Sequence, residues 1–257
     1  MCELLAMSAN VPTDVRFSFA ALSQRGGATG VHTDGWGISF YEQKGCRSIH
    51  DPNPSAHSEL ARFVRSYPIK SLIVIAHVRK ANRGRVALEN THPFSRELWG
   101  SAWSFAHNGQ LKGIKTRSLD FYASIGTTDS EYAFCWLLDR LRAMYPKRPS
   151  DHKLGWAIAE LFAELRTLGV FNALLSDGRA LYASCSTKLC YVERRAPFGP
   201  ATLIDEDMEV DFAKETTPDD RVVVLASTPL TRNEAWSQVP PQTTLVARMG
   251  TIVKTFR

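Results

Sequence analysis

The chain has 257 residues, of which 44% are hydrophobic and 22% are charged, a composition typical of a globular protein with a substantial core. Its longest apolar runs, at 72–76 and 222–226, are far too short to span a bilayer, and the N-terminus lacks a secretory signal, so we expect no membrane segment. The net charge of +5 comes from basic residues that are spread among acidic ones, which argues against a nucleic-acid-binding protein.

Short apolar runs rich in β-branched residues predict the strands. Several are separated by turn signals, as in LLSDGRALYAS, where Asp177-Gly178 marks a hairpin. Hairpins imply antiparallel sheets rather than alternating βαβ units. We expect strands at residues 3–8, 36–41, 71–78, 102–107, 170–176, 180–185, 221–226 and 244–256.

Apolar residues at helical spacing predict helices at 15–24, 55–66, 130–145 and 151–168. No repeat, low-complexity segment or Gly/Ser-rich or Pro-rich linker divides the chain. We therefore expect one domain of the α+β class over residues 1–257, with stacked antiparallel sheets and helices on the outside.

The five cysteines, at positions 2, 46, 135, 185 and 190, are scattered and odd in number, which favours the reducing cytoplasm over a disulfide framework. Cys185 and Cys190 have no CxxC spacing and no clustered histidines, so we expect structural thiols there and no metal site.

Cys2 stands directly behind the initiator methionine. If Met1 is removed, Cys2 carries a thiol and a free α-amine on one residue. A thiol is intrinsically nucleophilic, and an α-amine with a pKa of about 7.7–8.0 can accept its proton near neutral pH. Taken alone, however, a frayed terminus with an arbitrary residue explains this position more simply.

Two further stretches end strands with polar groups. Arg79, in AHVRKANRG, can pair bidentately with a carboxylate, although a surface arginine at a strand end is the commoner case. Asn108-Gly109, in SFAHNGQLKG, is usually a turn, but an asparagine amide beside a glycine N–H is also a good pair of donors for an oxyanion.

The stretch GTTDSEYAF precedes the third predicted helix. Thr128 or Asp129 is expected to cap that helix, and the Asp129 carboxylate could also bind an ammonium group. In chain order, the candidates are thus a nucleophile, a carboxylate clamp, oxyanion donors and an ammonium acceptor, a set suited to an α-amino acid with a side-chain carbonyl.

With these motifs in this order, the sequence resembles the class II glutamine amidotransferases of the N-terminal-nucleophile hydrolase superfamily. The resemblance rests on the initial Met-Cys, RGG, HTDGWGISFY, HVRKAN followed by NTHPF, AHNG, and TDSE before a helix, all within residues 1–145. The compact chain is similar to the stand-alone YafJ-like group of that family.

The resemblance implies a four-layer αββα sandwich of two antiparallel sheets flanked by helices. It also implies that Cys2 is the nucleophile and its own amine the base, and that Asn108 and Gly109 form the oxyanion hole. Arg79 would hold the α-carboxylate of glutamine and Asp129 its α-ammonium. His92, in the His-Pro step, would organise the substrate-binding loop.

The implied activity is hydrolysis of the glutamine side-chain amide to glutamate and ammonia, with no cofactor or metal and with a separate ammonia-accepting enzyme as a possible partner. Lys80, Asn82 and Arg83 depart from the family's usual loop, which has Trp after the clamp arginine and Thr-His shortly beyond. A hydrolase of another γ-glutamyl conjugate therefore remains an alternative, as does a non-catalytic module that retains the fold.

Overall fold

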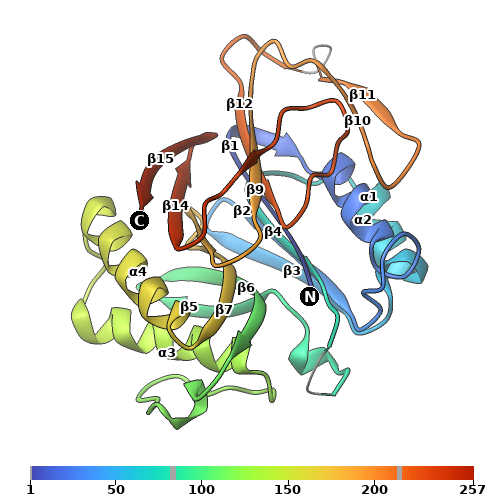
Figure 1. Cartoon of the computed structure of the whole chain (residues 1–257). Coiled ribbons are helices and arrows are strands. Elements are labelled where there is room, and N and C mark those ends of the chain that lie inside the picture. Colours follow the sequence, from blue (N-terminus) through green and yellow to red (C-terminus); the bar gives the residue numbers. More distant parts are fainter. Residues whose placement is uncertain (1, 82–84, 213–215) are drawn as a thin grey trace.

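The computed structural model describes residues 2–81, 85–212 and 216–257. Two antiparallel β-sheets face each other, and two α-helices pack against the outer face of each (Figure 1). This arrangement confirms the predicted α+β class and the four-layer αββα sandwich.

Within the described residues, the first sheet has seven strands in the order β13-β9-β12-β1-β4-β2-β3. Strand β1 lies inside this sheet and pairs antiparallel with β12 on one side and β4 on the other. The strands are β1 (Glu3–Asp14), β2 (Trp36–Glu42), β3 (Gly45–Asp51), β4 (Lys70–Val78), β9 (Cys190–Arg195), β12 (Arg221–Ala226) and β13 (Ser237–Gln238).

In the same described ranges, the second sheet has six strands in the order β15-β14-β8-β7-β6-β5, and a separate hairpin pairs β10 with β11. The strands are β5 (Phe94–Leu98), β6 (Ser101–Leu111), β7 (Gly169–Ser176), β8 (Leu181–Cys185), β14 (Thr243–Arg248), β15 (Thr251–Phe256), β10 (Pro200–Thr202) and β11 (Glu209–Asp211). The predicted Asp177-Gly178 hairpin connects β7 and β8, which pair antiparallel.

Side-chain caps fix where three helices begin, because each supplies an oxygen to a backbone N–H that has no partner inside the helix. Ser58, Thr128 and Ser150 accept hydrogen bonds from the N–H three residues later. The helices are α1 (Arg16–Gln24), α2 (Glu59–Ser66), α3 (Asp129–Met144) and α4 (Asp151–Arg166), with short 3₁₀ turns η1 (Ser55–His57), η2 (Leu88–Asn90) and η3 (Ile114–Thr116).

Four predicted elements were wrong in extent: strands 3–8 and 102–107 continue to Asp14 in β1 and to Leu111 in β6, and two longer runs are each divided in two. The run 244–256 is two strands, because Met249 and Gly250 both adopt positive φ (49° and 73°) and form a tight turn between β14 and β15. The run 55–66 is a 3₁₀ turn followed by α2, because Ser58 is extended and caps the helix. The sequence prediction also missed strands β3, β5, β9, β10, β11 and β13, which lie at sheet edges or are short or partly polar.

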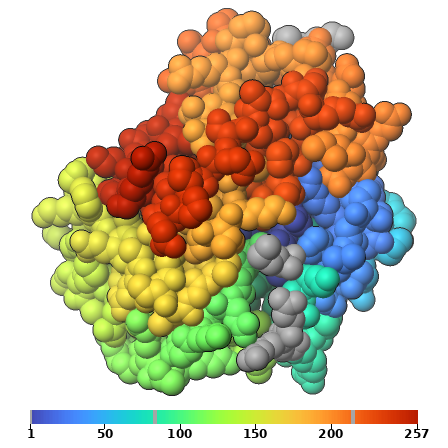
Figure 2. All heavy atoms as spheres, viewed as in Figure 1, coloured from blue at the N-terminus to red at the C-terminus, as the bar shows by residue number. Residues whose placement is uncertain are grey.

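Three hydrophobic cores separate the four layers. One lies between the first sheet and helices α1 and α2, a second lies between the second sheet and helices α3 and α4, and the third fills the space between the sheets. In the space-filling view, blue and teal parts of the chain lie beside the green part at the lower right of the face (Figure 2).

The alternation of side chains along β1 and β6 decides which residues meet between the sheets. Leu4 and Ala6 belong to the core between the sheets, and Cys2, the residue before β1, has the same parity. On β6, Ala106 belongs to the same core, and Asn108 shares its parity. Within the described residues, no helix is long and apolar enough to cross a membrane.

Candidate active site

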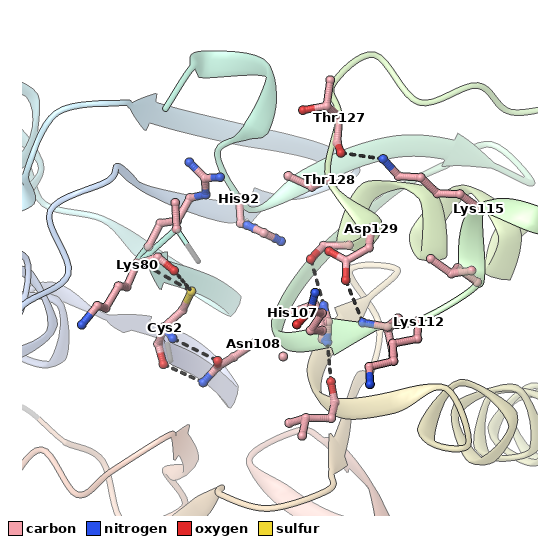
Figure 3. Close-up of a pocket in the computed structure, with 18 of the residues that line it drawn as sticks. Cys2, Lys80, His92, His107, Asn108, Lys112, Lys115, Thr127, Thr128 and Asp129 are labelled. Atoms are coloured by element: carbon pink, nitrogen blue, oxygen red, sulfur yellow. Dashed lines mark hydrogen bonds between the residues drawn. The ribbon is translucent and has the colours of Figure 1, made fainter. Parts of the chain in front are cut away.

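The N-terminal end of β1, the end of β4, and β6 enclose a cavity of about 780 Å³. All six residues that the sequence singles out line it: Cys2, Arg79, His92, Asn108, Gly109 and Asp129. Figure 3 shows Cys2 between Lys80 and Asn108, with Asp129 across the cavity. The structure therefore brings together residues that are as far apart as 2 and 129 in the sequence.

Asn108 holds the backbone of Cys2 at two points. The Cys2 backbone nitrogen donates to Asn108 Oδ1 at 3.0 Å, and Asn108 Nδ2 donates to the Cys2 carbonyl oxygen at 2.6 Å. A carboxamide nitrogen has two hydrogens, so one Nδ2 hydrogen is left for a ligand. Asn108 is itself buried, which fixes the position of its amide.

The Cys2 sulfur lies against the main chain of Lys80. Lys80 N donates to Sγ at 3.3 Å, and the thiol donates to Lys80 O at 3.4 Å (Figure 3). Burial raises the pKa of the Cys2 thiol, and the Lys80 N–H and the positive charge of Arg79 oppose this shift. Because burial is the largest contribution, the thiol is protonated near neutral pH, and attack on a carbonyl requires a base.

Gly109 occupies a position in β6 where only glycine fits. A Cβ atom built there would lie 1.8 Å from the carbonyl oxygen of Val170 on the neighbouring strand. Gly109 pairs with Phe171 across the ladder between β6 and β7. The Asn-Gly pair is therefore part of a strand, not the turn that it commonly indicates.

Arg79 is the first residue after β4 and is 3% exposed. Its Nη1 donates to the carbonyl oxygens of Asp34 and Arg85 at 3.4 Å in each case. These two contacts hold the guanidinium group at the cavity wall, and the forked geometry of a guanidinium group is suited to a carboxylate.

Thr128, and not Asp129, caps helix α3, because the Thr128 hydroxyl accepts the N–H of Glu131. Asp129 is the first helical residue, and its Oδ2 accepts the N–H of Leu111 at 2.7 Å. The second carboxylate oxygen retains acceptor capacity for a cation at the cavity.

The His92 ring packs at a tilt against His77, with ring centroids 4.3 Å apart, and against Phe94, at 4.4 Å. Both histidines are fully buried, and within the described part of the chain none of their four ring nitrogens has a hydrogen-bond partner. Burial lowers the pKa of His77 to about 3 and lowers that of His92 well below its usual range. Both rings are therefore neutral, and His92 presents an uncharged ring to the cavity.

The sequence prediction missed several other residues that line the cavity. His107 lies beside Asn108, and its ring nitrogens contact Ser130 Oγ at 2.8 Å and Val170 O at 3.0 Å. Lys112 and Lys115 follow β6, and Lys115 Nζ donates to Thr127 O at 2.7 Å (Figure 3). His107 could have been suspected, because AHNG places it beside the candidate oxyanion donors.

Only one of the three residues that depart from the family's usual substrate loop, Lys80, lies within the described part of the chain. The main chain of Lys80 contacts the Cys2 sulfur, whereas Asn82 and Arg83 lie outside the described residues. Among residues 2–81, 85–212 and 216–257, no group of His, Cys, Asp and Glu side chains is arranged to hold a metal ion. Cys185 and Cys190 are buried free thiols.

Comparison with known proteins gives consistent matches. A sequence profile of the family described as glutamine amidotransferases class-II matches residues 1–257. The chain is 59% identical over 242 residues to YafJ of Escherichia coli (strain K12), which is named as a predicted glutamine amidotransferase; the match covers 94% of this chain and 95% of YafJ.

Among solved structures, a predicted glutamine amidotransferase from Pseudomonas aeruginosa PA01 is 48% identical, with a TM-score of 0.79, over 98% of this chain and 100% of that one. Glutamine phosphoribosylpyrophosphate amidotransferase from B. subtilis has a TM-score of 0.62 at 15% identity, over 100% of this chain and 49% of that one. At this low identity, the likeness concerns the fold alone.

The buried histidine pair predicts acid sensitivity. The pKa of His77 is about 3 in the folded protein and near the ordinary value of 6.5 in the unfolded chain, so the unfolded state binds more protons between these values. The free energy of unfolding should fall as the pH drops below 6.5, by up to about 1.4 kcal/mol per pH unit for each such histidine. Urea unfolding between pH 7.5 and 4.5 measures this slope.

The variant His77→Gln should flatten the slope, and His92→Gln provides an independent test if the first variant does not fold. His57→Gln, at an exposed position, is the matched control and should keep the wild-type slope. If both buried-site variants also kept the wild-type slope, the histidine pair would not be the source of the acid sensitivity.

Gly109→Ala should be destabilising, because the added methyl group collides with the Val170 carbonyl and forces β6 away from β7. We expect a loss of about 1–3 kcal/mol in the free energy of unfolding, as for other overpacked sites, measured by urea denaturation. Gly199→Ala is the control, since a Cβ there meets nothing within 4 Å. Equal stability of both variants would contradict the steric requirement at Gly109.

Proposed function

The chain belongs to the class II glutamine amidotransferase family, and we propose that it hydrolyses the side-chain amide of glutamine with Cys2 as the nucleophile. The observation that carries this proposal is the double hydrogen bond between Asn108 and the backbone of Cys2 at the wall of a cavity that Arg79 and Asp129 also line. It fixes a terminal residue that would otherwise be free to fray.

The proposed reaction requires removal of Met1, which lies outside the described residues. The freed α-amine would keep its hydrogen bond to Asn108 Oδ1 and accept the thiol proton, because its pKa of about 7.7–8.0 suits a base near neutral pH. Such a base is needed, because burial raises the pKa of the Cys2 thiol.

In the acylation step, the Cys2 sulfur attacks the γ-carbonyl carbon of glutamine, and a C–S bond forms. The second hydrogen of Asn108 Nδ2 and the N–H of Gly109 stabilise the resulting oxyanion. The tetrahedral intermediate collapses as the C–N bond breaks, and the amine of Cys2 returns the proton to the leaving nitrogen, which departs as ammonia.

In the second step, water attacks the γ-glutamyl thioester, the C–S bond breaks, and glutamate leaves while the thiol regains a proton. The net reaction consumes one glutamine and one water and gives one glutamate and one ammonia. Arg79 would hold the α-carboxylate and Asp129 the α-ammonium, and the neutral ring of His92 would shape the pocket between them. These contacts keep the carbonyl against the sulfur and so supply proximity.

A second candidate substrate class is favoured by the size of the cavity. At about 780 Å³, it falls in the range of small-molecule sites and has room for a leaving amine larger than ammonia. A γ-glutamyl conjugate with a larger leaving amine would use the same residues and the same two steps.

We further propose that residues 1–257 act as one amidotransferase domain, because β1 and β12, from the two ends of the chain, pair in one sheet. Where the released ammonia serves a synthesis, a separate enzyme would have to accept it, since this domain accounts for hydrolysis alone. Retention of Met1 would favour the alternative of a non-catalytic module, because an acylated Cys2 nitrogen is no base.

Replacing Cys2 tests the nucleophile. Cys2→Ala should lower the rate of glutamate release by roughly 10⁴-fold or more, as expected when a covalent nucleophile is lost, while circular dichroism shows a folded protein. Cys46→Ala, at another partly exposed thiol, is the matched control and should keep wild-type turnover. Intact-mass measurement of the active protein should show that Met1 is absent.

Retained turnover in Cys2→Ala would end the covalent proposal, and a fully active protein that still carries Met1 would end the role of the α-amine.

Comparing leaving groups tests the substrate class. Glutamine and γ-glutamylglycine should both release glutamate, because the reacting groups are the same and the cavity has room for the larger amine. We expect kcat/KM to be higher for glutamine, measured by glutamate release at matched concentrations. Cleavage of the conjugate alone would establish the second candidate, and cleavage of neither would refute γ-glutamyl amide hydrolysis.

A further inference from the structure

The two peptide groups that flank Lys80 both contact the Cys2 sulfur. The group between Arg79 and Lys80 presents the Lys80 N–H to Sγ at 3.3 Å. The group between Lys80 and Ala81 presents the Lys80 carbonyl oxygen to Sγ at 3.4 Å. The sulfur thus lies against one donor and one acceptor from consecutive peptide planes.

The opposite ends of the same two peptide groups are held by Asp34. The backbone N–H of Asp34 donates to the Arg79 carbonyl oxygen at 3.1 Å. The side chain of Asp34 accepts the N–H of Ala81 at Oδ2, at 2.7 Å. One residue therefore binds both planes from the side away from the nucleophile.

The geometry of the peptide bond makes these contacts act on the sulfur. A peptide group is planar and almost always trans, so its C=O and N–H point in opposite directions. Fixing the Arg79 carbonyl on Asp34 aims the Lys80 N–H at Cys2, and fixing the Ala81 N–H on the Asp34 carboxylate aims the Lys80 carbonyl at Cys2. Either plane could rotate if its far end were released.

The hydrogen bonds of the sheet end before Lys80, so the sheet does not fix the peptide groups that Asp34 contacts. The last ladder partners of β4 are Glu3 and Trp36, which both pair with Val78. Beyond that point, the Arg79 N–H donates to Gly35 O at 2.7 Å, so the chain is held by the loop that carries Asp34.

We propose that Asp34 is a positioning residue for the nucleophile, whose carboxylate orients the Lys80–Ala81 peptide group on the Cys2 sulfur. Asp34 is absent from the residues that line the cavity, so it acts through the main chain and not on the substrate. The proposal rests on the nucleophilic role of Cys2.

Removal of the carboxylate should affect kcat more than KM. In Asp34→Ala, the backbone contacts of residue 34 with Arg79 remain. Arg79, the proposed ligand of the substrate α-carboxylate, therefore keeps its place. The Lys80–Ala81 plane loses its anchor, and a nucleophile displaced by about 1 Å commonly costs about 10²-fold in rate. We expect kcat for glutamine hydrolysis to fall by about that factor, with KM nearly unchanged.

Asp34→Asn supplies the conservative rescue. Its carbonyl oxygen can still accept the Ala81 N–H, so kcat should recover most of the loss seen in Asp34→Ala. Asp51→Ala is the matched control: Asp51 is a buried acid beneath the same loop, but it bonds Asn53 and Ser58 rather than residues 79–81. That control should lower the Tm and leave kcat unchanged.

The rate of Cys2 alkylation by iodoacetamide, followed by peptide mapping, gives a readout that needs no substrate. It should rise several-fold in Asp34→Ala, because a carbonyl oxygen beside the sulfur disfavours the thiolate and would no longer be held there. If the wild-type protein hydrolysed no γ-glutamyl amide, the proposed function would fail while this readout still tested the positioning role.

Three results would overturn the role of Asp34. They are wild-type kcat with unchanged alkylation in Asp34→Ala, an Asp34→Asn variant as impaired as Asp34→Ala, and an equal loss of kcat in Asp51→Ala.

Discussion

The arrangement of the site depends on a fixed position for Cys2, close to the N-terminus of the chain. Chain ends usually fray, yet the chemistry assigned to Cys2 needs its sulfur and nitrogen in fixed positions. Strand β1 meets this requirement because it lies inside the first sheet, with β12 on one side and β4 on the other. Asn108, from the opposite sheet, then binds the Cys2 backbone at both its nitrogen and its carbonyl oxygen. Because the two sheets face each other, the second sheet fixes the position of Cys2 at the end of a strand of the first sheet.

The alternation of side chains along β1 and β6, with a period of two residues, determines which residues meet at the site. On β1, Leu4 and Ala6 fill the space between the sheets, and Cys2 continues the same row at its open end. On β6, Ala106 belongs to that core and Asn108 follows it, whereas His107 points to the other side, where it stacks with Phe105. A slip of one residue in either strand would exchange these faces and separate the Cys2–Asn108 pair.

The sequence predicted the parts of this arrangement that local patterns encode. The strands of β-branched residues, the helix caps and the hairpin at Asp177 are short-range features, and motif order added the candidate residues. Strand β3 was missed because, as an edge strand, it has a mostly polar and half-buried sequence with no apolar alternation. No role in catalysis was predicted for Asp34 from the sequence, because its contact with Ala81 joins segments that no local pattern connects.

Burial explains why residues that do not line the cavity can still influence the Cys2 sulfur. The same burial that raises the pKa of the Cys2 thiol removes the water that would screen neighbouring dipoles, so each peptide group beside the sulfur acts more strongly than it would in solution. The Cys2 sulfur, which is only partly exposed at the cavity, is therefore sensitive to the orientation of the Lys80 peptide groups that contact it. The main chain around Lys80 consequently needs an anchor of its own beyond the end of β4, and the loop that carries Asp34 and Gly35 supplies it.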